Sequence, residues 1–257
     1  MTKLTRMGKF DMSAPASGPM ALLKKLRGTK EKSASAGANQ MAMLRRIPKL
    51  LRFIPGTAQD VRAYFLTLQY WLAGSEENMA NLVRSLVDRY ADGPRRRLRG
   101  AIKALPPAEY PEIGLYHPRM PGRVAETVDK LPSTGGKTKA TVGLLVMRSY
   151  VLAGNAGHYD GMISALEERG LKVIPVFATG LDARPAIEKY FLQDGRPTID
   201  AMVSLMGFSL VGGPAYNDAK AADEILTRLD VPYVAAHPVE FQTLEQWQES
   251  ERGLLPV

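Results

Sequence analysis

Residues 154–161 read GNAGHYDG and place a histidine, a tyrosine and an aspartate at three consecutive positions. Imidazole, phenol and carboxylate groups can exchange protons, ligate a metal or orient a ligand. The flanking glycines are typical of a turn, and an apolar helical pattern follows. Two interpretations are open. Either His158, Tyr159 and Asp160 belong to a site, or Tyr159 and Asp160 cap the helix while His158 satisfies backbone groups.

Strands and helices alternate from residue 138 onward and would position this turn. Strands buried on both faces that alternate with helices indicate a parallel sheet with right-handed crossovers. We therefore expect a Rossmann-like or flavodoxin-like α/β domain over residues 138–257. Apolar runs predict strands at 141–147, 172–178, 200–207 and 232–237, and helical patterns predict helices at 156–168, 183–191, 217–229 and 243–250.

The loops that follow parallel strands meet at one edge of the sheet, where ligands bind in open α/β folds. His158 and His237 each follow a predicted strand, and glycine-rich or polar loops follow the others. We therefore expect one crevice at this edge. Its candidate ligand-binding residues are His158, Tyr159, Asp160, Gly207, Gly212, Gly213, His237 and Glu240.

Three other motifs favour ordinary structural roles. LPSTGGKT at 131–138 has Leu131 where a phosphate-binding loop needs glycine, and a strand rather than a helix follows, so a linker is favoured. The arginines of PRRRLRG at 94–100 have no aromatic residues between them, which favours a solvated basic loop over a phosphate grip. The three histidines lack the i, i+4 spacing of a helical metal pair, so no metal site is predicted.

The first half of the chain has a different character. Small polar residues predict a linker or irregular segment over 1–40. Residues 41–55 place Leu44, Ile47, Leu51 and Ile54 on one helical stripe, with basic residues off it. Residues 59–90 read as two helices separated by Gly74, and 105–123 as a proline-rich irregular connection. We expect a helical, basic region over 41–137.

Charge divides the chain in the same way. Residues 1–140 hold 25 lysines and arginines against 11 acidic residues, whereas residues 141–257 hold 9 against 15, giving net charges of +14 and −6. A basic half indicates a nucleic acid, an anionic membrane, an acidic ligand or an acidic protein as partner. The absence of cysteine fits a reducing compartment, and no apolar run reaches the roughly 18 residues of a bilayer span. A cytoplasmic protein is expected.

Six stretches carry a resemblance to a known family: LTRMGKFDM at 4–12, IPKLLRFIP at 47–55, LQYWLAGSEENMANLV at 68–83, and residues 157–182, 200–218 and 229–257. They resemble the large porphyrin-binding H subunits of magnesium chelatase, which act in chlorophyll and bacteriochlorophyll synthesis. The cobalt chelatase large subunits share a looser version of the pattern. The family's members are several times longer, so the resemblance implies one segment of such a large protein.

The resemblance implies ATP-dependent insertion of Mg²⁺ into protoporphyrin IX, with ATP hydrolysed on partner motor subunits I and D. It carries over no catalytic residue, and the segment alone is expected to be inactive. A porphyrin has two carboxylates and an apolar face, which Arg148 and Arg184 at the crevice rim or the basic stretch 41–55 could meet. Alternatively, 41–55 makes a peripheral membrane contact.

Two other classes of function remain open from the residues alone. The α/β domain could be a non-catalytic module that binds a small anion or a partner protein, or the chain could be part of a large cobalt chelatase subunit. Nucleic-acid binding by the basic half is a third option, which the lack of interleaved aromatic residues disfavours. No nucleic acid is expected as partner.

Overall fold

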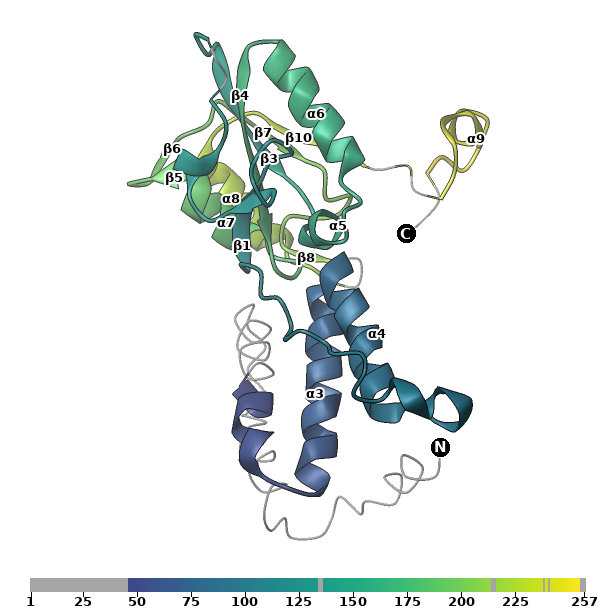
Figure 1. Cartoon of the computed structure of the whole chain (residues 1–257). Helices are drawn as coiled ribbons and strands as arrows, with labels where there is room; N and C mark the ends of the chain where they lie inside the picture. Colours follow the sequence, from purple (N-terminus) through teal and green to yellow (C-terminus); the bar gives the residue numbers. More distant parts are fainter. Residues whose placement is uncertain (1–45, 134–135, 214–215, 238, 240, 255–257) are drawn as a thin grey trace. The chain divides into compact units, whose positions relative to one another are not determined.

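The computed structural model describes residues 46–133, 136–213, 216–237, 239 and 241–254 (Figure 1). The chain forms two compact units, residues 1–66 and 67–257, and each is described by itself. Helix α3 (Thr57–Ala73) crosses the boundary between them. The expected segmentation into 1–40, 41–137 and 138–257 stays a prediction.

The first unit has a small apolar core. A helix covers 46–50 and continues as the 3-10 helix η2 (Leu51–Phe53), where Ile47 and Leu51 are buried against Ala58. These positions confirm part of the stripe predicted for 41–55. Ile54 departs from it with 43% exposure, because the helix has ended at Phe53, and Leu44 lies outside the described residues.

The two helices predicted over 59–90 are confirmed as α3 and α4 (Glu76–Tyr90). Gly74 ends α3 with a φ of +65°, a conformation that favours glycine. Ser75 then caps α4, because its side chain accepts a hydrogen bond from the backbone N–H of Asn78 at 3.2 Å. A 3-10 helix, η3 (Gly93–Leu98), follows α4 and carries the three consecutive arginines.

An extended segment, residues 105–112, runs back along α4, and we call it the strap. Asn78 is fully buried and pairs with Ala108 twice, donating to its carbonyl at 3.0 Å and accepting from its N–H at 2.9 Å. Asn81 accepts from the N–H of Leu105 at 3.0 Å, and the Tyr70 hydroxyl donates to the Leu105 carbonyl. Side-chain amides thus supply the hydrogen bonds that a neighbouring strand would supply.

The other end of the strap is attached to the sheet. Arg148 donates to the carbonyls of Pro111 at 2.9 Å and Tyr110 at 3.3 Å. The backbone N–H and the hydroxyl of Thr179 both donate to the Glu112 carbonyl. The strap therefore has defined partners along its length despite its lack of regular secondary structure.

The main sheet has six strands in the order β10-β7-β3-β4-β1-β2. Its centre is parallel: β3 (Ala140–Leu145), β4 (Leu171–Ala178), β7 (Ala201–Ser204) and β10 (Tyr233–Ala235). The four predicted strands and the α/β class are confirmed.

Two further strands were not expected from the sequence. β1 (Ile113–Tyr116) pairs antiparallel with β4, and β2 (Val124–Ala125) pairs antiparallel with β1. The prediction that 105–123 is entirely irregular is therefore wrong. Prolines surround IGLY in the sequence and disfavour a strand there, yet these four residues form one whose last three residues are buried.

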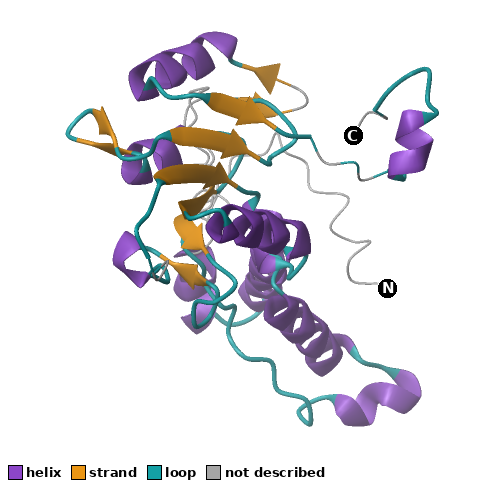
Figure 2. Cartoon of the chain, turned by 90° about the horizontal axis from the view of Figure 1, so that it is seen from above, coloured by secondary structure: helices purple, strands orange, loops and turns teal. Residues whose placement is uncertain are grey.

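Helices cover both faces of the sheet (Figures 1 and 2). α5 (Arg148–Leu152) and α6 (Gly157–Glu168) pack on one face, in a core with Leu144, Val173 and Phe177. α7 (Arg184–Tyr190) and α8 (Ala219–Leu229) pack on the other, with Leu145 and Ile174. Successive residues of each strand point to opposite faces, so one apolar run supplies both cores.

Smaller elements complete the second unit. β5 (Leu192–Gln193) pairs with β6 (Arg196–Pro197), β8 (Gly212–Gly213) pairs with β9 (Tyr216–Asn217), and η4 (Val128–Lys130) follows β2. The helix α9 (Leu244–Gln248) begins with a capping box between Thr243 and Gln246. The helix predicted from residue 217, with Asn217 as its natural N-cap, begins two residues later, because Asp218 is the N-cap and accepts a hydrogen bond from the N–H of Ala221. Among the described residues, no helix is long and apolar enough to cross a bilayer.

Candidate functional site

The carboxyl ends of the parallel strands lie together at one edge of the sheet, as the sequence predicts. Leu145, Ser204 and Ala235 are paired across β3, β7 and β10, so the loops that follow these strands leave from neighbouring positions. β3 lies between β4 and β7, and the chain goes first to β4 and then to β7. The connections from β3 and to β7 therefore run in opposite directions across the sheet. Open α/β sheets bind ligands at the carboxyl ends of the strands beside such a reversal.

The three residues of the GNAGHYDG turn have three different surroundings. His158 is exposed and its ring lies 3.8 Å, centroid to centroid, from that of Tyr159. Tyr159 is 1% exposed and its hydroxyl accepts a hydrogen bond from Met147 N–H at 3.1 Å. Asp160 accepts from Arg123 at 2.6 Å and from the Tyr116 hydroxyl. The capping interpretation is wrong, because α6 starts after Ala156 with no side-chain cap.

A second group of candidates meets across the loops after β7 and β10. His237 is exposed and its Nδ1 lies 3.1 Å from the carbonyl oxygen of Gly207. Gly212 donates its N–H to the Leu181 carbonyl at 2.8 Å, which ties the β7 loop to the β4 loop. Gly213 is the last residue of β8, and Glu240 lies outside the described residues. A crevice shared by both groups stays a prediction.

The two arginines expected at the rim are already engaged. Arg148 holds the strap, as described above. Arg184 pairs with Asp182 through Nη2 at 2.7 Å and Nε at 3.0 Å, and this pairing raises the pKa of the guanidinium. A carboxylate ligand would have to compete with these partners, so neither arginine is a preformed anion site.

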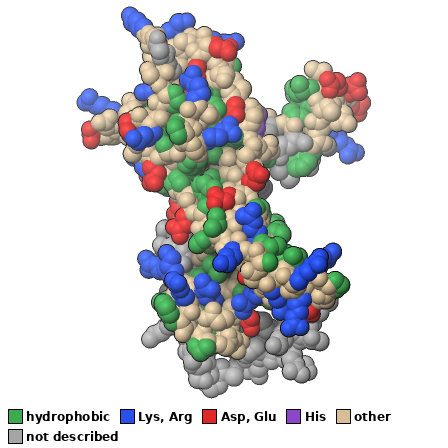
Figure 3. All heavy atoms as spheres, viewed as in Figure 1, with side chains coloured by type: hydrophobic (Ala, Val, Ile, Leu, Met, Phe, Trp, Pro, Cys, Tyr) green, Lys and Arg blue, Asp and Glu red, His purple; other side chains and the backbone are tan. Residues whose placement is uncertain are grey.

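Arginine side chains lie among hydrophobic ones over α4 and η3 (Figure 3). Arg95, Arg96 and Arg97 of η3 are exposed, and none of the ion pairs among the described residues includes them. This exposure agrees with a solvated basic loop.

Sequence reasoning missed a polar cluster between α6 and the β1–β2 hairpin. Glu167 accepts two hydrogen bonds from Arg119, both at 2.9 Å, and lies 3.1 Å from Nε2 of His117. One helical face carries both Glu167 and Asp160, seven residues apart, and the hairpin supplies the basic partners. That i, i+7 spacing was the available signal, because it places both carboxylates on one side of α6.

Burial and the hydrogen bonds of this cluster shift two pKa values. Burial, and then the hydrogen bond to Asp160, raise the pKa of Tyr116 above its usual value, so its hydroxyl stays protonated. The His117 side chain is 1% exposed, and this burial lowers its pKa although Glu167 acts in the opposite direction. Nδ1 of His117 accepts from the N–H of Arg119, so Nε2 carries the proton and donates to Glu167.

We expect stability to decrease as the pH falls below about 6.5, the ordinary pKa of histidine. In that range the unfolded chain binds a proton that folded His117 resists, so the free energy of unfolding falls with pH by at most about 1.4 kcal/mol per unit. Urea unfolding between pH 7.5 and 5.5 measures this slope. His117→Gln, which does not titrate, should flatten it, and His158→Gln should leave it intact. An equal slope in wild type and His117→Gln would contradict the prediction.

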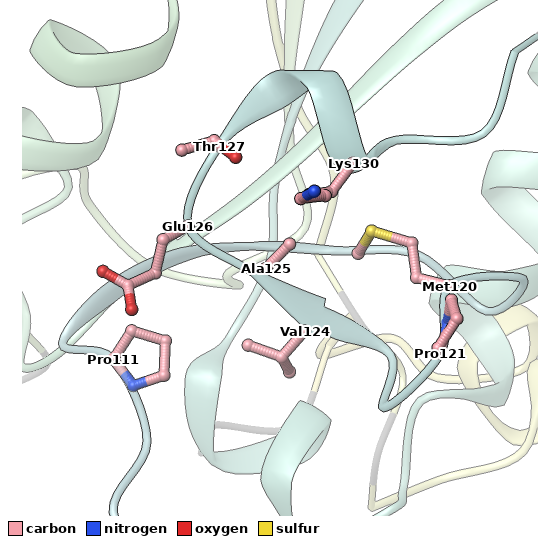
Figure 4. Close-up of a pocket in the computed structure, with 8 residues that line it drawn as sticks. All are labelled: Pro111, Met120, Pro121, Val124, Ala125, Glu126, Thr127 and Lys130. Atoms are coloured by element: carbon pink, nitrogen blue, oxygen red, sulfur yellow. The ribbon is translucent and has the colours of Figure 1, made fainter.

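An open hollow of about 470 Å³ lies along β2, the outermost strand (Figure 4). Pro111, Met120 and Pro121 line it together with Val124 and Ala125. Neighbouring strand residues point to opposite faces, so a hollow lined by both Val124 and Ala125 follows the edge of the sheet. It lies on the opposite side of β4 from the β3 and β7 loops.

Among the described residues, no group of three or more histidine or acidic side chains is arranged to hold a metal ion. The loops after β7 and β10 therefore offer one imidazole, that of His237, rather than a metal-binding cluster. The contact between His237 and Gly207, at the edge beside β3 and β7, is the part of the candidate site that we consider further.

Comparisons with known proteins show which family the sequence of this chain matches. The family model described as CobN/Magnesium Chelatase matches residues 68–257, and a model described as a domain of unknown function matches residues 1–65. A solved structure titled "Catalytic Subunit of Cobaltochelatase from Mycobacterium tuberculosis" aligns over 76% of this chain and 15% of that chain, at 23% identity and a TM-score of 0.47.

Curated relatives extend over the whole chain. The magnesium-chelatase H subunit of Cereibacter sphaeroides is 57% identical over 257 residues, which is 100% of this chain and 21% of that protein. The chloroplastic magnesium-chelatase protein ChlH of Oryza sativa subsp. indica is 36% identical over 272 residues, 99% of this chain and 19% of that protein. The chain thus spans about one fifth of these relatives and belongs to the CobN/magnesium chelatase family.

Proposed function

We propose that this chain is part of a magnesium chelatase H subunit, which binds protoporphyrin IX and takes part in ATP-dependent insertion of Mg²⁺. The observation that carries the proposal is 57% identity over all 257 residues to a protein named as the H subunit of magnesium chelatase. Mg²⁺ and the porphyrin are substrates of this reaction. The product would enter chlorophyll or bacteriochlorophyll synthesis.

ATP hydrolysis is assigned to partner motor subunits I and D. In these 257 residues, the nearest match to a phosphate-binding loop has Leu131 in place of glycine. The enzyme would be a ligase that forms nitrogen–metal bonds, and the chain by itself is expected to be inactive. The family name also includes the cobalt enzyme, but the relatives at 57% and 36% identity are named for magnesium.

A cytoplasmic location and a peripheral membrane contact through 41–55 are part of the proposal. Ile47 and Leu51 are buried within the first unit, so they do not face a bilayer. Leu50 and Phe53 are 60% and 83% exposed and lie next to Lys49 and Arg52. An exposed apolar pair beside cations fits the surface of an anionic membrane.

A chimera tests the proposed function. Residues 1–257 would replace the matching fifth of the Cereibacter sphaeroides protein, and Mg²⁺ insertion would be assayed with protoporphyrin IX, ATP and the motor subunits. We expect insertion by the chimera and none by the 257-residue chain. A folded chimera that binds the motor subunits but inserts no Mg²⁺, or inserts Co²⁺ faster, would refute it.

A further inference from the structure

We propose that His237 is the axial ligand to the metal of a bound metalloporphyrin, and this rests on the proposed function. The ligand class is a planar tetrapyrrole that already contains its metal, such as the magnesium porphyrin that the reaction forms. The imidazole of His237 would bind the metal from one face of the ring. The site would then retain a metalloporphyrin more tightly than the metal-free ring.

The hydrogen bond of His237 to the described residues uses Nδ1 and not Nε2, the nitrogen that would bind the metal. Nδ1 lies 3.1 Å from the Gly207 carbonyl oxygen, which can only accept, so Nδ1 must carry the proton. In the neutral ring Nε2 then keeps its lone pair, and the side chain is exposed. Metal-ligating histidines usually donate their second nitrogen to a carbonyl or carboxylate in this way, which fixes both the tautomer and the ring orientation.

The other two histidines differ from His237, one in burial and the other in the lack of a hydrogen bond that fixes its tautomer. Both ring nitrogens of His117 make hydrogen bonds, and its side chain is 1% exposed. His158 packs its ring at 3.8 Å from Tyr159 and 5.7 Å from Tyr150, with no hydrogen bond from its ring to the protein among the described residues. Only His237 therefore combines exposure with a tautomer that the backbone fixes.

A single imidazole matches what a metalloporphyrin needs. The described residues provide no group of three ligands, so they cannot enclose a free ion. A porphyrin supplies four nitrogens itself and leaves only axial positions to the protein, as in haem proteins with one proximal histidine. Hydrated Mg²⁺ prefers oxygen ligands, so His237 acts on the metal inside the ring rather than on the free ion.

The residue that His237 contacts has no side chain. Gly207 has a φ of +78°, in the region that favours glycine. It belongs to the loop after β7, at the edge of the sheet where α/β folds bind ligands. A broad ring can lie close to such a backbone because no Cβ projects from it.

The test uses the 257-residue chain without a histidine tag and three porphyrins: metal-free, magnesium and cobalt(II) protoporphyrin IX. We expect tighter binding of the magnesium porphyrin than of the metal-free ring, by about tenfold or more. The electron paramagnetic resonance spectrum of the cobalt porphyrin should show an extra hyperfine splitting from one axial nitrogen. A water ligand would not produce that splitting.

The decisive variant is His237→Asn, because its amide can still donate to Gly207 while the Nε2 ligand is gone. It should lose the nitrogen splitting and the preference for metal, yet bind the metal-free ring as wild type does. His158→Asn should keep the splitting. The proposal is overturned if His237→Asn keeps the splitting, if His158→Asn loses it, or if wild type shows none. If the 257-residue chain binds metal-free porphyrin but shows no preference for metal, or binds no porphyrin, the proposal for His237 fails, whereas the proposed function is tested separately by the chimera.

Discussion

Replacing Asn78 with alanine is expected to destabilise the second unit by about 2–4 kcal/mol. The side chain is fully buried and makes both hydrogen bonds to the backbone of Ala108. Its loss leaves an N–H and a carbonyl without partners and opens a cavity beside α4. Urea unfolding followed by the fluorescence of Trp71, in a Trp247→Phe background, reports on this region.

Asn155→Ala is the matched control for Asn78→Ala. Asn155 is exposed, and its substitution should change the free energy of unfolding by less than about 0.5 kcal/mol. Asn78→Asp is a second test variant. Its carboxylate can accept a hydrogen bond from the N–H of Ala108 but cannot donate one to the Ala108 carbonyl. Equal stability of Asn78→Ala and Asn155→Ala would show that the strap does not depend on the asparagine.

Gly143→Ala is expected to destabilise the sheet by about 1–3 kcal/mol. Gly143 lies in the central strand β3, where a Cβ atom would be 2.6 Å from Phe191 and 2.8 Å from Ile199. Both neighbours are buried, at 0% and 4% exposure, so neither can move freely. Gly161→Ala is the control of opposite sign, because nothing lies within 4 Å of that site in α6 and alanine favours helix.

A double-mutant cycle identifies the cause of the Gly143 effect. Phe191→Leu removes the ring carbons that a Cβ at position 143 would meet. Steric overlap predicts that the double variant is more stable than the sum of the two single losses, with a coupling above about 0.5 kcal/mol. Additive losses would instead assign the effect of Gly143→Ala to the backbone.

The parallel strands and most helices could be predicted because their signals are local. Apolar runs such as 172–178 marked buried strands, and Gly74 and Ser75 marked a helix end and start. β1 could not be predicted in this way, since four residues among prolines carry too short a pattern. Its partner β4 lies about sixty residues away, and only the folded sheet brings them together.

The candidate site was predictable in its position but less so in its details. Topology placed His158 and His237 after strand ends, because parallel strands share a carboxyl edge. It could not show that Tyr159 points into the core or that Asp160 turns to Arg123, since rotation along α6 decides both. The contact of His237 with Gly207 depends on two loops thirty residues apart, which no local pattern reports.

The strap also bears on how this protein would respond to a protease. A proline-rich stretch without regular secondary structure is usually read as a cutting site, and cleavage needs several residues to lift away from the fold. Here side chains from α3, α4, the start of α5 and Thr179, the residue after β4, make hydrogen bonds to the backbone of the strap. Their partners are carbonyls or N–H groups of Leu105, Ala108, Tyr110, Pro111 and Glu112. Brief digestion should therefore spare this stretch and leave α4 and the sheet on one fragment.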